Sequence, residues 1–192
     1  SNPSGKASVN PEARQKIRSE TLRGNLSLNK RLEKKEGAAE KGEDLVSVII
    51  VTHNGANFIE SCLHSVYSQT HKKLEVICVD NRSTDGTVAK IKKNFPRVRL
   101  TELKKNIHYA GGINRGIKVA RGSRLFILNQ DTELEDDCVA QLVAKAKSEP
   151  EAGAVVPMMK FSRLRGFING IGNQVNNHGW GTDNFIYCTD IG

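Results

Sequence analysis

The residues of this chain best suited to chemistry are Asn129 and Asp131, an amide and a carboxylate two positions apart. They follow the apolar run Leu125–Leu128, which predicts a strand buried on both faces. If extended geometry continues past that strand, the two side chains lie on the same side of the chain. Two oxygen-bearing groups there suit a hard cation that bridges phosphate oxygens. Alternatively, Asp131 closes a turn or caps a helix that starts near Asp136.

Polar side chains also end the apolar runs further upstream. They are Thr52 and Asn54 after the first run, Asp80 and Asn81 after the second, and Asn106 after the third. A carboxylate can accept a hydrogen bond from a pyrimidine N–H or a ribose hydroxyl, and an amide can contact base edges or phosphates. Each residue alone is more often a turn former, but their recurrence at successive strand ends favours a shared ligand site.

An alternating order of strands and helices would bring these residues together. Strands are predicted at 45–52, 74–79, 97–101, 123–128 and 153–157, with helical patterns between them. This order predicts right-handed βαβ crossovers and an α/β fold, with a mostly parallel sheet and helices on both faces. In such a sheet the carboxyl ends of the strands share one edge, which is where ligands bind.

The two ends of the chain differ from this central part. Residues 1–44 are polar and have few large apolar side chains, so we expect a disordered or loosely helical arm before a domain at 45–192. Residues 158–192 are rich in Gly and Asn, and no element is assigned there. The chain ends at Gly192 without a helix cap or a polar tail, which we interpret as a truncated C-terminal part of the domain.

The formal net charge of +8 is compatible with nucleic acid, an anionic membrane surface or phosphate-bearing ligands. Basic pairs such as Lys72–Lys73 and Lys104–Lys105 are not interleaved with aromatic residues, which argues against nucleic acid. The four cysteines form no CxxC pair, which disfavours zinc. Without a signal-peptide pattern or a long apolar run, we expect a cytoplasmic location, with peripheral association at the inner face of the membrane left open.

Two phosphate-binding patterns are missing from the sequence. No G-x-G-x-x-G follows the first strand and no Walker A pattern occurs, so a dinucleotide site is disfavoured. Gly111 and Gly112, with Gly116, begin a helical stretch in mid-chain. They could let the backbone approach a phosphate or a sugar, or could allow close helix packing.

Four segments of the chain contain the polar strand ends. They are Val48–Asn54, Val79–Gly86, Asn106 with Ala110–Gly116, and Leu128–Glu133. Together they resemble family 2 glycosyltransferases of the GT-A fold, and most closely their rhamnosyltransferase-like branch. The resemblance implies an inverting, metal-dependent enzyme of polysaccharide or cell-wall biosynthesis. It would transfer a sugar such as rhamnose from a UDP- or dTDP-sugar to a glycan or lipid-linked acceptor.

The resemblance also implies roles by position. The nucleotide-sugar site would be lined by Thr52, Asn54, Asp80, Asn81, Ser83, Asn106, Gly111, Asn114 and Asn129. Asp80 would contact the base, and Asn106 and Asn114 would lie near the ribose or the donor sugar. Asn129-Gln130-Asp131 stands in the place of the family's D-x-D, so Asp131 would hold Mg²⁺ or Mn²⁺. Two departures are Asn129 at the first D-x-D position and His108 where this branch often has Gly.

Inverting transfer also needs a carboxylate base that deprotonates the acceptor hydroxyl. In the family this base comes from an acidic segment after the fifth strand, and the late carboxylates here are only Asp183 and Asp190. Both are weak candidates, since one lies in a Gly-rich stretch and the other beside the terminus. A nucleotide-binding module without transfer activity, or a truncated inactive fragment, is therefore the main alternative. An interaction protein whose basic arm docks on anionic lipid is a third.

Overall fold

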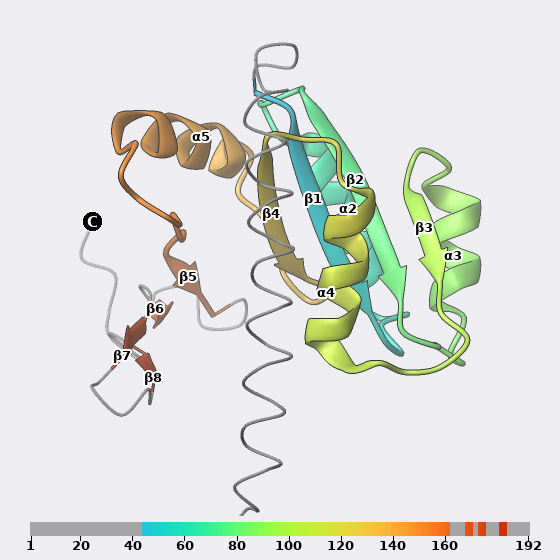
Figure 1. Cartoon of the computed structure of the whole chain (residues 1–192). Coiled ribbons are helices and arrows are strands. Elements are labelled where there is room, and N and C mark those ends of the chain that lie inside the picture. Colours follow the sequence, from blue (N-terminus) through green and yellow to red (C-terminus); the bar gives the residue numbers. More distant parts are fainter. Residues whose placement is uncertain (1–43, 162–167, 171–172, 176–180, 184–192) are drawn as a thin grey trace, which may run out of the picture.

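The computed structural model describes residues 44–161, 168–170, 173–175 and 181–183 (Figure 1). Four parallel strands form one sheet in the order β3-β2-β1-β4. They are β1 (Val46–Thr52), β2 (Leu74–Asp80), β3 (Arg99–Glu102) and β4 (Arg124–Asn129). The predicted α/β fold with a parallel sheet is confirmed. The observed strands begin and end within about two residues of the predicted ranges.

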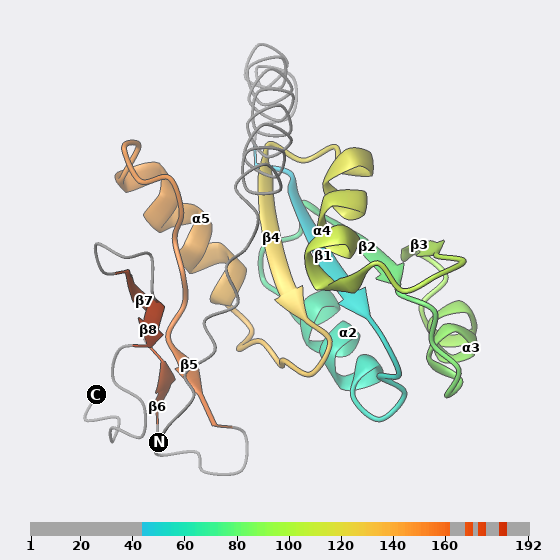
Figure 2. The same ribbon diagram turned by 60° about the horizontal axis from the view of Figure 1, so that its bottom comes forward.

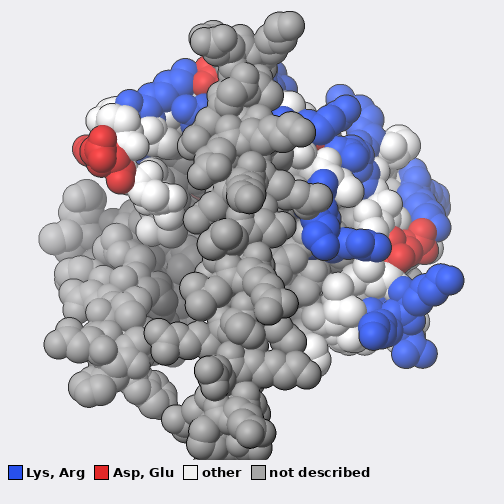
Figure 3. Space-filling view, viewed as in Figure 1, with Lys and Arg blue, Asp and Glu red and all other residues white. Residues whose placement is uncertain are grey.

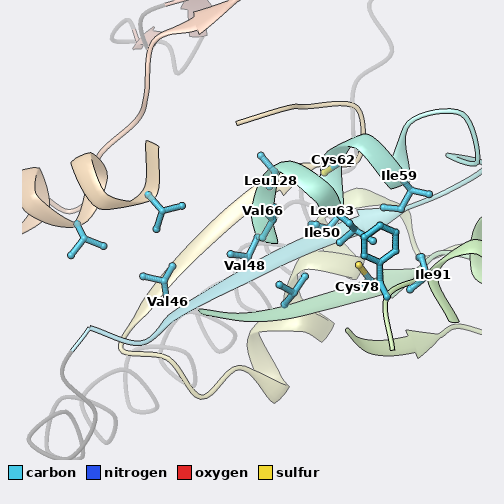
Figure 4. Packing of buried hydrophobic residues seen from close by; sticks show 14 residues of the cluster. Val46, Val48, Ile50, Ile59, Cys62, Leu63, Val66, Cys78, Ile91 and Leu128 are labelled. Atoms are coloured by element: carbon cyan, nitrogen blue, oxygen red, sulfur yellow. The ribbon is translucent and has the colours of Figure 1, made fainter. Parts of the chain in front are cut away.

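Four helices cover both faces of this sheet (Figure 2). They are α2 (Ile59–Ser68), α3 (Thr87–Asn94), α4 (His108–Val119) and α5 (Cys138–Ser148). Because side chains alternate along a strand, Val48 and Ile50 of β1 pack in one cluster with residues of α2, α3 and α5 (Figure 4). Ile49 points to the other face and packs in a second cluster beside α4. All seven residues of β1 are therefore buried, as its β-branched run predicts.

Two glycines allow helix α4 to pack directly on β1. A Cβ atom added at Gly112 would lie 2.7 Å from a methyl carbon of Val51, and one at Gly116 would collide with Ile49. These contacts support close helix packing as the role of both residues. Gly111 differs, because the nearest atoms to its added Cβ would belong to the side chain of Ile107, at 3.1 Å.

Strand β4 is more exposed than its apolar sequence suggests. The prediction that Leu125–Leu128 is buried on both faces is wrong, since Leu128 is buried but Ile127 is 45% exposed. The reason is that β4 is the end strand of this sheet. Leu128 belongs to the cluster that includes α5, whereas α4 on the opposite face packs on β1 and β2.

The predicted fifth strand at 153–157 is not observed. These residues form no strand, and Val156 is 66% exposed, so the run is not part of the buried sheet. The next strand, β5 (Met159–Lys160), pairs antiparallel with β6 (Ile168–Gly170), and β7 (Asn173–Val175) pairs antiparallel with β8 (Gly181–Asp183). In the part of the chain described here, no helix is both long and apolar enough to cross a membrane.

A buried carboxylate joins the strands at the amino end of the sheet. Glu75 of β2 is only 7% exposed and accepts hydrogen bonds from the Ser47 hydroxyl at 2.6 Å and from the guanidinium groups of Arg99 and Arg121, each at 3.0 Å. The backbone N–H of Gly122 donates to the same carboxylate at 3.1 Å. Burial alone would raise the pKa of Glu75, but these hydrogen bonds outweigh it and lower the pKa to about 2.

Candidate active site at the carboxyl edge of the sheet

Thr52 and Asp80 are neighbours at the ends of β1 and β2, where the sheet register pairs them. The Thr52 hydroxyl donates a hydrogen bond to Oδ1 of Asp80 at 3.0 Å, and the backbone N–H of Ser83 donates to Oδ2 at 3.0 Å. Both side chains are buried. The Asp80 carboxylate is thus fixed in position, and each oxygen still has a lone pair for a further donor.

The loop after β1 is hydrogen-bonded to the loop after β2. The backbone N–H of Asn54 donates to the Ser83 hydroxyl at 3.0 Å, and the backbone N–H of Thr84 donates to the Asn54 side-chain oxygen at 2.9 Å. Asn54 has a left-handed backbone, with φ of 49°, which Asn tolerates better than most residues. Five of the predicted site residues therefore lie in one connected group: Thr52, Asn54, Asp80, Asn81 and Ser83.

Asp85 strengthens the same loop pair, although it was not among the predicted site residues. Its carboxylate accepts hydrogen bonds from the backbone N–H of Ala56 at 2.9 Å, from the backbone N–H of Thr87 at 3.1 Å and from the Thr87 hydroxyl. The hydroxyl bond is the main reason that the pKa of Asp85 is lowered. An Asp whose side chain accepts from the N–H two residues later forms an Asx turn, and here this turn leads into α3.

Two asparagines shape the loop between β3 and α4. The Asn81 side-chain oxygen accepts from the backbone N–H of Ile107 at 2.8 Å, and the Asn106 side-chain oxygen accepts from that of His108 at 2.8 Å. His108 has a left-handed φ of 61°. In this structure both oxygens serve the loop itself, while Asn114 lies exposed on α4.

The end of β4 is tied to the end of β1 by Gln130, a residue that the sequence pattern did not single out. Its side-chain oxygen accepts from the backbone N–H of His53 at 3.0 Å, and its side-chain nitrogen donates to the His53 carbonyl at 3.2 Å. The chain turns at this point, since the Thr132 N–H donates to the Asn129 carbonyl at 3.3 Å. Extended geometry therefore does not continue from Asn129 to Asp131, and that expectation is wrong.

Tyr109, in the first turn of α4, reaches the end of β4. Its hydroxyl donates a hydrogen bond to the side-chain oxygen of Asn129 at 2.7 Å. Partial burial, and then the negative charge of Asp131, raise the pKa of Tyr109. The Asp131 side chain is itself exposed and makes no hydrogen bond or ion pair with another described residue. Its carboxylate is available to a ligand.

The connected loops lie where the sheet reverses its winding. β1 continues into α2 on one face, whereas the chain enters β4 from α4 on the other face. The point between β1 and β4 is therefore the topological switch point, at which open α/β sheets bind ligands. Residues 47–187 match the family model described as "Glycosyl transferase family 2". The chain belongs to glycosyltransferase family 2.

Similar proteins in this family share about half of the chain. A chondroitin synthase of Pasteurella multocida (strain Pm70) is 39% identical over 98 residues, which are 50% of this chain and 10% of that protein. The putative teichuronic acid biosynthesis glycosyltransferase TuaG of Bacillus subtilis (strain 168) is 34% identical over 96 residues, which are 48% of this chain and 38% of TuaG. The chain therefore spans well under half the length of these relatives. The match is to the family as a whole, and the rhamnosyltransferase-like branch stays a prediction.

Solved structures of other proteins have a similar fold. The crystal structure of S. aureus TarS has a TM-score of 0.52 and 23% identity, and the match covers 62% of this chain and 24% of TarS. A structure of TarS residues 1–349 in complex with UDP-GlcNAc matches with the same TM-score and 24% identity. At this level of identity the likeness concerns the GT-A fold alone.

A divalent cation, which the resemblance implies, would have few protein ligands in this chain. Among the described residues, no three His, Cys, Asp or Glu side chains are grouped closely enough to hold an ion by themselves. Asp131 offers one free carboxylate at the position of the second D-x-D acid. Mg²⁺ is commonly bound through one or two carboxylates together with substrate phosphates and water. The donor set therefore fits a cation that arrives with a diphosphate rather than a site formed by protein alone.

The two candidates for the catalytic base are not placed by this structure. Asp183 is the last residue of β8, and only its backbone is described. Asp190 lies outside the described residues, as do residues 1–43 of the predicted arm. Asp44, the last residue of that arm, is in contact with the domain, since its carboxylate pairs with Lys147 at 2.7 Å and with Arg124 at 3.3 Å.

Proposed function

We propose that this chain binds the nucleotide-diphosphate sugar of an inverting, metal-dependent glycosyltransferase. The observation that carries the proposal is the convergence of two groups at the switch point of the sheet. The buried Thr52–Asp80 pair lies at the ends of β1 and β2, and the exposed Asn129 and Asp131 lie at the end of β4. The nucleotide base needs fixed and buried surroundings, whereas the diphosphate needs open and polar ones.

Each group has a defined part in the proposal. Asp80 accepts from the N–H of the nucleotide base, because both of its oxygens are already oriented by protein donors. Asn54 and Ser83 lie beside Asp80 on the loop side, and Asn106, Gly111 and Asn114 would lie toward the ribose and the sugar. Asp131 would hold Mg²⁺ or Mn²⁺ on the diphosphate, and the cation would neutralise the charge that develops on the leaving group.

The names of similar proteins support a role in building polysaccharides. They include a chondroitin synthase, a teichuronic acid glycosyltransferase and a poly-beta-1,6-N-acetyl-D-glucosamine synthase of Staphylococcus aureus. We therefore propose a UDP- or dTDP-sugar as donor, with rhamnose as one candidate sugar, and a glycan or lipid-linked acceptor.

The surface charge favours a membrane-bound acceptor over a free one. No acidic residue occurs between Leu103 and Gln130, whereas Lys104, Lys105, Arg115, Lys118, Arg121 and Arg124 do. On the face shown in Figure 3, Lys and Arg cover much more of the described surface than Asp and Glu. Basic residues attract anionic headgroups by about 1 kcal/mol each when they lie near the surface. Co-sedimentation with vesicles that contain anionic lipid, but not with neutral vesicles, is the expected result.

The test of the donor site is nucleotide binding with and without metal. A ligand that binds only the folded state raises the melting temperature by mass action. UDP or dTDP with Mn²⁺ should raise it for the parent chain, and Asp131→Ala should abolish the part that depends on Mn²⁺. Glu133→Ala is the matched control, because Glu133 is an exposed acid in the same loop. Equal stabilisation of the parent and Asp131→Ala by nucleotide and metal would disprove the metal assignment.

The alternative function is a nucleotide-binding module that performs no transfer. It predicts the same binding results, and it differs only in an assay of product formation. Such an assay needs a matched donor and acceptor, because acceleration depends on a positioned acceptor as well as on the donor.

A further inference from the structure

The side-chain amide of Asn129 has one of its two polar ends occupied by the protein. Tyr109 Oη donates to Asn129 Oδ1 at 2.7 Å. In an amide, only the oxygen can bind a cation, and the nitrogen can only donate. Tyr109 uses one of the two lone pairs of this oxygen, whereas the N–H₂ group of Asn129 donates to no described residue and is the end left without a partner.

Tyr109 is held in this place by the loop before it. The Asn81 side chain fixes the backbone of Ile107, and the Asn106 side chain fixes that of His108. His108 takes a left-handed backbone, with φ of 61°, immediately before Tyr109. Such a conformation is costly for a residue with a side chain and persists only where its surroundings impose it. The hydrogen bond from Tyr109 is thus a property of a constrained loop rather than of a free surface side chain.

The consequence concerns the first position of the N-x-D motif. A carboxylate there would attract a cation and repel a diphosphate, whereas an N–H₂ group does the opposite. Asn129 is exposed, so its nitrogen can reach a bound ligand. Resting on the proposed function, we infer that Asn129 donates a hydrogen bond to a diphosphate oxygen of the donor. Tyr109 is the positioning residue that keeps its amide in that orientation, and Asp131 alone carries the cation.

The affinity for the nucleotide should then have two contributions. One part depends on metal and on Asp131, and the other depends on Asn129 and persists without metal. The readout is the ratio of UDP affinities measured by calorimetry in Mn²⁺ and in EDTA. A change that merely loosens the fold lowers both affinities together and leaves this ratio unchanged.

Two variants test the two residues. Asn129→Asp keeps the shape of the side chain and replaces the donor by a carboxylate. It should lower UDP affinity in EDTA by at least about tenfold, because a hydrogen bond to a charged group is lost, and should raise affinity for Mn²⁺ alone. Tyr109→Phe removes only the hydroxyl and frees the amide to rotate. It should lower UDP affinity in EDTA by a few-fold and raise the ratio of the affinities in Mn²⁺ and EDTA.

The outcomes distinguish this inference from the proposed function. If the parent chain binds UDP in neither condition, the proposed function is wrong and the inference is wrong with it. If the parent binds UDP but Asn129→Asp has the parental affinity ratio, only the role of Asn129 is disproved. If Asn129→Asp shows the expected change and a folded Tyr109→Phe does not, the role of Tyr109 is disproved. Should Tyr109→Phe fail to fold, Tyr109→His and Tyr109→Leu replace it. Tyr109→His keeps a polar ring, so its ratio of UDP affinities in Mn²⁺ and EDTA should be closer to the parental ratio than that of Tyr109→Leu.

Discussion

The side chain of Gln130 closes two hydrogen bonds with the backbone of His53, at 3.0 and 3.2 Å, and so joins β4 to β1 beyond the end of their pairing. These strands flank the switch point at which we place the diphosphate. Gly55 lies under this contact, because a Cβ atom added there would collide with the Gln130 side chain. The middle residue of the N-x-D motif is therefore structural, whereas its exposed neighbours Asn129 and Asp131 are the residues that we propose to contact the donor.

This packing predicts coupled effects of Gly55 and Gln130 on stability. Gln130→Ala should cost about 0.5–1.5 kcal/mol, because the exposed backbone groups of His53 exchange their Gln130 partner for water. Gly55→Ala should also destabilise the parent, since the added methyl group meets the Gln130 amide. In the Gln130→Ala background the same change should cost far less, because the obstructing atoms are gone. Urea unfolding of the four chains measures the coupling, and additive effects would contradict the arrangement.

Glu75 predicts a dependence of stability on pH. Its pKa of about 2 in the folded chain lies below the ordinary value of 4.5, so the carboxylate stabilises the fold above pH 4.5. That contribution should be lost as the pH falls from 4.5 towards 2, and we expect roughly 2 kcal/mol after screening by water around the two arginines.

The measurement is the free energy of unfolding at several pH values between 6 and 2.5, for the parent and for Glu75→Gln. The variant should be less stable at pH 6 and should show a shallower loss below pH 4.5. Equal slopes in this range would assign the acid sensitivity to other carboxylates. Glu151→Gln is a suitable control, because Glu151 is exposed and forms no ion pair with another described residue.

Removal of residues 1–43 should leave the denaturation midpoint nearly unchanged. This stretch has few large apolar side chains and so has little surface to bury on folding. Asp44 should be retained, because it pairs with Lys147 and Arg124 and its carbonyl lies 2.8 Å from the His71 ring nitrogen. A loss of several kcal/mol on removing residues 1–43 would show that the arm packs on the domain.

The position of the general base can be tested by product formation. We expect that the chain of 192 residues binds donor but forms little product, because base catalysis alone contributes about 10²–10⁴-fold and neither Asp183 nor Asp190 is a strong candidate. Asp183→Asn and Asp190→Asn should leave UDP affinity unchanged. If the parent does turn over and one of these variants stops it while keeping its affinity for UDP, the base lies at that residue.

The central strands were predictable from sequence because their surroundings are uniform. β1 is covered on both faces, and six of its seven residues are β-branched, with polar residues after its carboxyl end. The exposed edge of β4 and the missing strand at 153–157 were not predictable, since an apolar run does not show which neighbours will cover it. Ile127 and Val156 look like core residues in sequence and are exposed in the structure.

The site was predictable to a similar extent. Turn-forming residues at strand ends identified Thr52, Asp80 and Asn129 as neighbours of a shared edge. The hydrogen bond between Tyr109 and Asn129 was not foreseen, because it depends on the left-handed backbone of His108 and on the direction of α4. A single side chain that crosses between elements leaves no periodic signal in the sequence.

The carboxylate of Glu75 also has a consequence for the order of folding events. It accepts hydrogen bonds from Ser47 of β1, from Arg99 of β3 and from the Arg121–Gly122 turn before β4. These residues are separated from Glu75 by 24 to 47 positions in the sequence. These bonds can all exist only after all four strands have aligned, so they should be largely unformed in the transition state. Loss of Glu75 should then accelerate unfolding and hardly slow refolding, as expected of a position with a low φ-value. The hydrogen bonds of Glu75 would therefore slow unfolding of the domain. They lie at the amino end of the sheet, opposite the carboxyl end that carries the candidate site.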